Sequence, residues 1–313
     1  LQVSGTGLFH IYNSNDSFLS GMTLDVDGGE FRVGDLASDN EADLDMSSGI
    51  IDISGGTIKI CDELDVADGT ITISGGNLNI GAYTGSSDGT DADRFEMEAG
   101  TLNLTGGTIN IYGQKSSSSN DAMDLDAGVT VNATTSNTIN LAAGQGSNDE
   151  DMYITVGGNE LGNLTISNTS YKVLTEDNVD LKGNLTISSG TFDMDNGNNN
   201  LNLEGDLSIS GTLDANDQTI TFDGTASTSC PTISDPTLDI VVNKSSTGKV
   251  TFAGTCSFDE ITVTDGIFAI TSNTVTADNT VSIADGAELE IGTGTFNADG
   301  AINANTSGEI DFT

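Results

Sequence analysis

Acidic side chains are the residues of this chain whose types and spacing point most directly to chemistry. They gather in three loop-like segments, each of which follows a glycine-punctuated apolar run. The members of the three groups are Asp39, Glu41 and Asp43; Asp88, Asp91 and Asp93; and Asp149, Glu150 and Asp151. Hard cations such as calcium take about six to eight oxygen ligands from carboxylates and carbonyls. We therefore predict calcium sites at these loops; the alternative is solvated surface charge.

Residues suited to catalysis are scarce. His10 is the only histidine, and it lies outside the repeated part of the chain, so no Ser-His-Asp set can be built around the repeats. Arg32 and Arg94 are the only arginines, whereas a lyase acting on an acidic polysaccharide needs basic groups to hold its substrate. We predict that the chain is not an enzyme. A polysaccharide-acting hydrolase is the less favoured alternative, because a chain so rich in acids offers many carboxylate pairs.

The charge balance excludes several partners. The 313 residues carry 48 acidic and 8 basic side chains, for a formal net charge of −40. Such a chain does not neutralise phosphates, so we expect no binding to nucleic acid. We also expect repulsion from anionic membrane surfaces and no membrane insertion, since no apolar run approaches the roughly 20 residues of a spanning helix. Cations should be attracted.

The cysteines and the chain start point to an extracellular setting. Cys230 and Cys256 lie in similar surroundings, and we predict a disulfide between them in an oxidising compartment. The alternative is a pair of buried thiols, which is also what we expect of Cys61. The chain opens on Leu1 rather than methionine, as a processed secreted chain or a fragment would.

A twenty-residue repeat identifies the elements that must position these groups. The apolar–Asp–apolar triplets 24–26, 44–46 and 64–66 each precede a glycine and an alternating apolar pair. The glycines are Gly29, Gly49 and Gly69, and the pairs are Phe31/Val33, Ile51/Ile53 and Ile71/Ile73. Short period-two strands broken at glycine cannot bury their own apolar sides, but stacked copies can.

Stacking makes definite predictions about side chains. Ile51, Ile71 and Leu102 should lie inward on consecutive turns, and so should Ile53, Ile73 and Leu104. Asp25, Asp45 and Asp65 should form an outward ladder, with like charges about 4.8 Å apart. Such a ladder either recruits cations or turns its carboxylates into water.

We predict an all-β fold, a parallel β-helix (β-solenoid) with about 20-residue rungs, roughly 15 of them, and acidic loop insertions on one side. A solenoid followed by β-sandwich domains is the alternative. Three regions are expected: a terminal strand or subunit-contact segment at 1–20, a regular solenoid at 21–160, and a second solenoid section at 161–313. Two blocks of the last section repeat after about 75 residues.

The N-terminal stretch is apolar but precedes the first clear rung. Its apolar residues are Leu1, Val3, Leu8, Phe9 and Ile11. An isolated apolar strand exposes an unpaired edge, which proteins generally avoid. We expect it either to cap its own solenoid or to add to the sheet edge of a neighbouring copy.

The second half carries runs such as Gly-Asn-Leu-Thr-Ile-Ser-Ser-Gly-Thr-Phe at 183–192 and Gly-Thr-Leu-Asp-Ala-Asn-Asp-Gln-Thr-Ile-Thr-Phe-Asp-Gly at 211–224. With them, most of residues 160–300 resembles bacterial and archaeal cell-surface β-helix repeat proteins, such as adhesins and autotransporter passengers. The resemblance implies a β-helix and a location outside the cell, and no activity.

These observations together predict an extracellular or cell-surface structural protein. We expect a self-assembling subunit of a filament, sheath or layer, whose partners are copies of itself joined head to tail and whose cofactor is calcium. The alternative is an adhesin or carbohydrate-binding module. In that case Tyr83, Tyr112 and Tyr153, which follow rung ends on the loop side, would stack on sugar rings of surface glycans.

Overall fold

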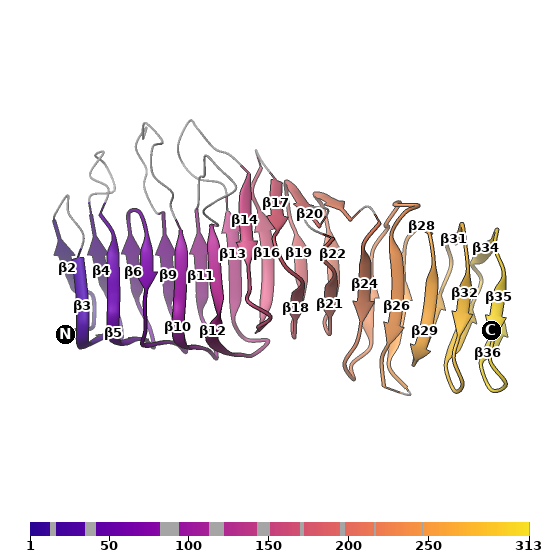
Figure 1. Ribbon diagram of the computed structural model, residues 1–313, viewed down its shortest axis with the longest axis horizontal. Helices are drawn as coiled ribbons and strands as arrows, with labels where there is room; N and C mark the ends of the chain where they lie inside the picture. Colours follow the sequence, from indigo (N-terminus) through magenta and orange to yellow (C-terminus); the bar gives the residue numbers. More distant parts are fainter. Residues whose placement is uncertain are drawn as a thin grey trace.

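The computed structural model is an elongated stack of short strands that runs from the N-terminus at one end to the C-terminus at the other (Figure 1). It describes residues 1–12, 17–34, 42–81, 94–112, 122–142, 151–169, 172–194, 198–215, 217–245 and 247–312. Every pair of neighbouring strands is parallel, and the strands of successive rungs lie in register. The fold is therefore a parallel β-helix, as predicted. The described residues contain no helix, and hence none that is long and apolar enough to cross a membrane.

Two sheets run along the first two thirds of the stack. We name them sheet A and sheet B. Sheet A contains β1 (Gln2–Val3), β3 (Ser17–Val26), β5 (Leu44–Ile53), β7 (Leu64–Val66), β8 (Thr70–Ile73), β10 (Phe95–Leu104), β12 (Met123–Ala133), β14 (Met152–Thr155), β17 (Lys172–Thr175), β20 (Thr191–Asp193) and β23 (Thr212–Asp214). Sheet B contains β2 (Leu8–Ile11), β4 (Glu30–Val33), β6 (Thr57–Ile60), β9 (Asn77–Ile80), β11 (Thr108–Ile111), β13 (Thr138–Ala142), β16 (Asn163–Ser167), β19 (Leu185–Ile187) and β22 (Leu207–Ile209).

Three further sheets, C, D and E, form the C-terminal part. Sheet C contains β15 (Glu160–Leu161), β18 (Val179–Leu181), β21 (Leu201–Leu203), β24 (Thr219–Phe222), β26 (Asp239–Asn243), β29 (Ile261–Asp265), β32 (Val281–Ile283) and β35 (Ile302–Ala304). Sheet D contains β25 (Thr228–Cys230), β27 (Lys249–Phe252), β30 (Ile267–Ile270), β33 (Glu288–Ile291) and β36 (Glu309–Phe312). Sheet E contains β28 (Cys256–Phe258), β31 (Thr274–Ala277) and β34 (Thr295–Ala298).

Stacked glycines shape the long strands of the first section. Gly49, Gly69 and Gly100 occupy one column and have φ values of 128°, 137° and 107°. A Cβ added to Gly100 would lie 2.2 Å from the carbonyl oxygen of Gly69, so the rung below leaves no room for a side chain. Both the positive φ and the close approach require glycine. This column separates the two apolar halves of β5 and of β10, whereas Met22 and Val129 occupy the position in β3 and β12.

The rung changes character near residue 160. From β15 onward most turns have three short strands, and sheet C continues the line of the second halves of the long strands, since β15 packs beside β12. Sheets A and B themselves run on past this point, to β23 and β22. The predicted boundary between residues 160 and 161 therefore coincides with a change of cross-section. The division into separate domains stays a prediction.

A second discontinuity lies further along, where sheets A and B end and sheets D and E begin. Only sheet C is continuous across it, through β21, β24 and β26. Strands β22 and β25 lie next to each other without a backbone ladder in the described residues. The Asp206 carboxylate takes the place of a backbone carbonyl there, because its Oδ1 accepts a 2.7 Å hydrogen bond from the Ser229 amide.

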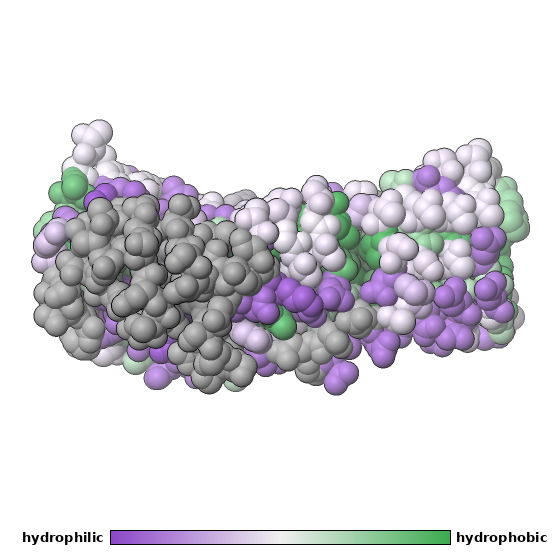
Figure 2. Space-filling model, turned by 90° about the horizontal axis from the view of Figure 1, so that it is seen from above, coloured by the Kyte–Doolittle hydropathy of each residue, from purple (hydrophilic) through white to green (hydrophobic). Residues whose placement is uncertain are grey.

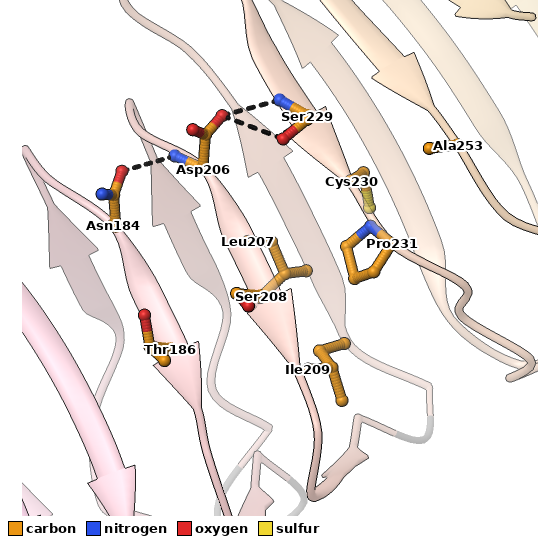
Figure 3. Close-up of a pocket in the computed structure, with 10 residues that line it drawn as sticks. All are labelled: Asn184, Thr186, Asp206, Leu207, Ser208, Ile209, Ser229, Cys230, Pro231 and Ala253. Atoms are coloured by element: carbon orange, nitrogen blue, oxygen red, sulfur yellow. Dashed lines mark hydrogen bonds between the residues drawn. The ribbon is translucent and has the colours of Figure 1, made fainter.

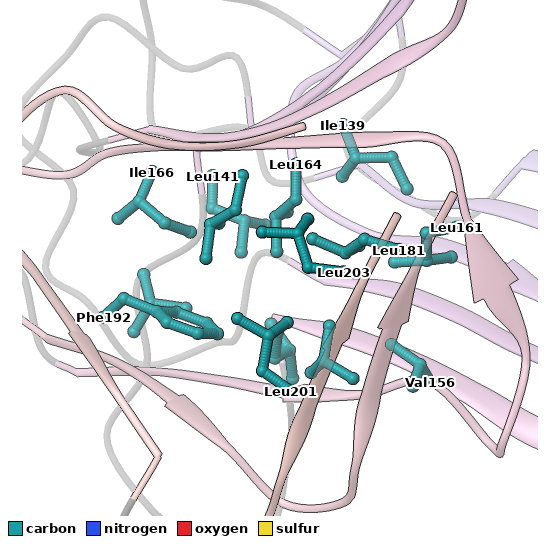
Figure 4. Close-up of a cluster of buried hydrophobic side chains, with 14 of the residues drawn as sticks. Ile139, Leu141, Val156, Leu161, Leu164, Ile166, Leu181, Phe192, Leu201 and Leu203 are labelled. Atoms are coloured by element: carbon teal, nitrogen blue, oxygen red, sulfur yellow. The ribbon is translucent and has the colours of Figure 1, made fainter. Parts of the chain in front are cut away.

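One continuous hydrophobic core fills the stack, and Figure 4 shows its middle part. The predicted inward columns are confirmed: Ile71 pairs with Ile51 and Leu102, and all three are fully buried. Ile53, Ile73 and Leu104 form the neighbouring column in the same way.

The register of the first copy is a correction to the sequence analysis. Leu24 pairs with Ile51 rather than with Leu44, and Phe31 pairs with Ile58 rather than with Ile51. The apolar–Asp–apolar pattern occurs twice in one rung, at 44–46 and at 51–53, so the triplet 24–26 matches either. Residues 17–19 take the place that the sequence analysis gave to the triplet 24–26. The 75-residue repeat likewise aligns residues that lie in different sheets, since Leu164 lies in sheet B and Ile240 lies in sheet C.

The N-terminal stretch is the first rung rather than a segment before it. Strand β1 pairs with β3, and β2 pairs with β4. Both strands continue the columns of the stack and leave their outer edges without a partner strand in the described residues.

Candidate functional site

The N-terminal end of the stack exposes core positions. Val3, Phe9 and Ile11 pair with the buried residues Val26, Phe31 and Val33, so their side chains belong to the inward columns. The Phe9 ring stacks on the Phe31 ring, with centroids 5.6 Å apart. Nothing in the described chain covers the other face of the Phe9 ring, which is 41% exposed. We call Leu1, Phe9, Ile11 and the buried Val3 the N-end face.

The fifth residue of the predicted contact segment lies elsewhere. Leu8 pairs with Glu30, which points outward, and Leu8 is exposed on the side of the stack. It therefore borders the N-end face without belonging to the inward columns.

The C-terminal end exposes the same columns. Ile302, Ile310 and Phe312 pair with the buried residues Val281, Leu289 and Ile291. Phe312 is nevertheless 76% exposed and Ile302 is 45% exposed, because no further rung in the described residues covers them. We call Phe296, Ile302, Ile310 and Phe312 the C-end face. Figure 2 shows apolar surface at both ends of the molecule.

The C-end face was not predicted from the sequence. Its signal is a likeness between the two ends of the chain, each of which has an apolar strand, a short turn closed by glycine and a second apolar strand. The two similar segments, residues 302–312 and 1–11, lie at opposite ends of the chain. A comparison of neighbouring rungs therefore does not reveal their similarity.

The outward acidic ladder exists in a different register from the predicted one. Asp45 pairs with Asp65, Asp65 with Glu96, and Glu96 with Asp124, whereas Asp25 belongs to the column of Asp52. Arg94 lies beside this ladder, where it forms an ion pair with Glu63 and a 2.5 Å ion pair with Glu96. Burial raises the pKa of Glu63 to about 7, against the opposing effect of Arg94. Arg94 therefore balances part of the negative charge of the ladder.

Most of the predicted calcium ligands lie outside the described residues: Asp39, Glu41, Asp88, Asp91, Asp93, Asp149 and Glu150. The other two make backbone contacts across rungs. Asp43 accepts a 3.2 Å hydrogen bond from the Glu63 amide, and Asp151 accepts a 2.9 Å hydrogen bond from the Lys172 amide. The part of the chain that the structure describes contains no cluster of three metal-ligating side chains. Calcium binding stays a prediction.

The cysteines are free and buried in the structure, so the predicted bond between Cys230 and Cys256 is not formed there. The Cys256 thiol instead lies 3.5 Å from the carbonyl oxygens of Pro231 and Gly254. Burial raises the pKa of both thiols, which disfavours the reactive thiolate. The disulfide stays a prediction for the oxidised protein.

A pocket of about 490 Å³ lies where β22 and β25 separate (Figure 3). Its apolar side includes Leu207 and Pro231, and its polar side includes Thr186, Asp206 and Ser208. The Asp206 carboxylate is held by Ser229, and the Asp206 amide donates a 2.8 Å hydrogen bond to Asn184 Oδ1. Sequence reasoning missed this pocket, because it arises from a break between sheets rather than from a motif.

The remaining candidates make local contacts. His10 Nε2 lies 2.6 Å from the Gly34 carbonyl oxygen, and its ring meets the Tyr12 ring edge-on. Tyr112 directly follows β11 and Tyr153 lies within β14, where both are partly buried, and Tyr83 lies outside the described residues. The predicted stacking of these tyrosines on sugars and the predicted absence of catalysis both stay predictions.

Comparison with known proteins identifies no relative: no family model, no curated protein and no solved structure matches this chain.

Proposed function

We propose that this protein is an extracellular structural subunit that assembles end to end into a filament, sheath or layer. The observation that carries the proposal is the exposure of core columns at the first and last rungs that the structure describes. Phe9 is 41% exposed and Phe312 is 76% exposed, although their counterparts in the neighbouring rungs are buried. The acidic composition and the resemblance to cell-surface β-helix proteins favour a location outside the cell.

The physics of an open β-helix end favours association. Each end presents unpaired strand edges, which template pairing with another chain. Covering the exposed apolar side chains contributes about 25 cal/mol for each Å² removed from water. The two end faces belong to opposite ends of one stack, so a contact between them is head to tail and continues into an open polymer. The net charge of −40 opposes assembly at low salt, and cations should promote it.

The test is the mass of the particles as a function of protein concentration, followed by sedimentation velocity and electron microscopy at moderate salt with calcium. Ile302→Asp should keep the protein monomeric, because it places a charge on the C-end face. Ile50→Asp is the matched control: Ile50 is 43% exposed, close to the 45% of Ile302, but it lies on the side of the stack. A wild-type chain that remains monomeric at every concentration contradicts the proposal, as does an equal loss of assembly in both variants.

Binding of a neutral glycan is the second candidate function, and the pocket at the sheet break favours it. Thr186 and Ser208 are neighbours in the register of β19 and β22, and Asp206 lines the same pocket. Hydroxyl and carboxylate groups over an apolar floor are suited to the hydroxyls of a sugar. A glycan array should then show binding that Ser208→Val abolishes and Ser282→Val, an outward change on β32, does not.

A further inference from the structure

Sheet B carries a long outward face without charge in a strongly acidic chain. We propose that this face, from β9 to β22, binds a linear neutral polysaccharide that lies along the stack, and that the pocket at the sheet break is one end of the binding surface. The inference rests on the second candidate function, glycan binding at the pocket, and specifies the class of glycan and the surface that holds it. It does not depend on end-to-end assembly.

The uncharged face covers the consecutive strands β9, β11, β13, β16, β19 and β22. No Asp, Glu, Lys or Arg occurs in these strands. Sheets A, C and D, by contrast, each present outward carboxylates, for example at Asp65, Asp180 and Glu290. Sheet E is also uncharged, but it has only 3 strands. One outward column of sheet B consists of amides and hydroxyls alone: Asn79, Asn110, Asn140, Thr165, Thr186 and Ser208.

A face without charge discriminates among polymers. The net charge of −40 repels polyuronates, sulfated glycans and nucleic acids from the whole molecule. A cationic partner is attracted to the outward carboxylates of the other sheets rather than to this face. The uncharged face of sheet B is therefore suited to an uncharged polymer.

Hydrogen bonds between rungs fix the amides of the column. Asn110 Nδ2 donates a 2.8 Å hydrogen bond to Asn79 Oδ1, and Asn140 Nδ2 donates a 3.1 Å hydrogen bond to Asn110 Oδ1. Ser167 Oγ continues the series with a 2.8 Å hydrogen bond to Asn140 Oδ1. The side chains are thus oriented before a ligand arrives, which lowers the entropy cost of binding.

Each amide of this ladder keeps capacity for a ligand. A carboxamide offers two N–H donors and an oxygen with two lone pairs. The ladder uses one donor and one lone pair of Asn110, and the others have no partner among the described residues. A sugar hydroxyl both donates and accepts, so it can use both. Because the rungs repeat at about 4.8 Å, the row is suited to a polymer of hydroxyl-bearing units rather than to one small molecule.

The column leads into the pocket at the sheet break. Thr186 and Ser208 belong to the column and also line the pocket (Figure 3). Leu207 and Pro231 supply apolar surface there, on which the carbon face of a sugar ring can pack. One surface thus combines a cavity of about 490 Å³ for a sugar unit with an ordered polar row for the rest of the chain.

The dependence of affinity on chain length is the first test. Linear glucan, mannan and galactan oligosaccharides of increasing length are titrated calorimetrically, with polygalacturonate as the anionic counterpart. At least one neutral series should bind, with an affinity that continues to rise beyond the disaccharide, and polygalacturonate should not bind. Failure of all three neutral series to bind overturns the proposal, as does equal binding of polygalacturonate.

A matched pair of variants tests the amide ladder. Asn110→Asp should weaken binding of the longest oligosaccharide about tenfold, because it removes a donor and places a charge on the face. Asn103→Asp is the control. Asn103 belongs to a similar ladder on sheet A, where it donates a 3.3 Å hydrogen bond to Thr72 Oγ1 and accepts a 2.9 Å hydrogen bond from Asn132. This control should leave the affinity unchanged, and equal losses in the two variants overturn the proposal.

A second pair avoids both ladders, so that a folding defect of Asn110→Asp does not decide the result. Thr138 points outward on sheet B and Thr101 points outward on sheet A, and both are half-buried. Thr138→Glu should weaken binding of the longest oligosaccharide, and Thr101→Glu should not. Equal affinities of these two variants overturn the proposal.

Ser208→Val separates the extended face from the pocket. It should abolish binding of disaccharides, whereas Asn110→Asp should leave disaccharide binding unchanged and weaken only that of longer chains. An affinity that does not rise with length and is lost in Ser208→Val alone overturns the extended face and leaves the pocket as a glycan site. Absence of all glycan binding overturns both and leaves end-to-end assembly, which sedimentation tests, standing.

Discussion

The interior rungs and the two terminal rungs are built from the same columns of side chains, and they differ in whether a neighbour covers both sides. Ile71 lies between Ile51 and Leu102 and is fully buried. Phe312 lies on Ile291 on one side only and is 76% exposed. Within the described residues, the inward positions stay apolar up to both ends of the stack. In a solenoid each rung contacts only its neighbours, so the first and last described rungs lack the second neighbour that an interior rung has.

The largest expected effect is in the interior. Ile71→Asp buries a carboxylate without a partner between two rungs and should destabilise the chain by about 3 kcal/mol or more. Ile302→Asp, on the C-end face, should change the stability of the monomer far less, because its carboxylate reaches water. Urea denaturation of both variants at a concentration that keeps the protein monomeric checks this contrast. Similar midpoints for the two would mean that the interior and the ends are not packed differently.

Glycine substitutions provide the next contrast. Gly100→Ala should destabilise by about 2 kcal/mol, since its φ of 107° is unfavourable for alanine and the new Cβ would meet the Gly69 carbonyl. Gly5, in the turn of the first rung, has a φ of 66°, but a Cβ added there would meet no heavy atom within 4 Å. Gly5→Ala therefore has no clash and only the cost of a left-handed φ that alanine can adopt, so its loss of stability in thermal melts should be smaller than that of Gly100→Ala.

Glu63 should give the interior a pH dependence. Burial raises its pKa from 4.5 to about 7, so the folded chain binds more protons than the unfolded chain between these values. This contribution to stability is fully present below pH 4.5 and is lost as the pH rises through 7. Glu63→Gln removes it, so the wild type should lose more stability than the variant between about pH 5 and pH 8. Equal losses, measured by urea denaturation, would contradict a raised pKa.

Of these changes, added calcium should have the smallest effect on the stability of a single chain. This prediction concerns the acidic loops of the N-terminal section. If these loops bind calcium, millimolar calcium raises the melting temperature more than sodium does at the same ionic strength. Equal stabilisation by the two salts would mean that cations act by screening alone. Neutralising Asp88, Asp91 and Asp93 together to asparagine should remove the specific part of the effect.

The sequence was sufficient to predict the fold class and most of the core. Alternation around glycine placed Ile51, Ile71 and Leu102 correctly, because inward and outward positions differ in polarity at every rung. It was not sufficient for the register of the first copy, since Leu24-Asp25-Val26 and Ile51-Asp52-Ile53 carry the same pattern as Leu44-Asp45-Met46. The first and the second half of a long strand differ in the turn that precedes them. The polarity of the neighbouring residues does not reveal to which half such a triplet belongs.

The candidate sites were less predictable. The sequence analysis named all four residues of the N-end face, because apolar side chains at the edge of a repeat stand out in the sequence, and their part in assembly stays a prediction. The C-end face and the pocket were not, since Phe312 looks like any inward residue until its exposure is seen, and the pocket depends on where β22 and β25 diverge. Both features arise from the order of rungs rather than from any local motif.

Amide hydrogen exchange at two protein concentrations tests most directly whether the end rungs complete each other. Peptides covering residues 1–11 and 302–312 should exchange quickly in the dilute monomer and slowly in the concentrated protein, because the strand edges then acquire partners. A peptide covering residues 64–80 should be equally protected in both samples. Terminal peptides that exchange equally fast at both concentrations, in a sample that sedimentation shows to be polymerised, would contradict end-to-end stacking.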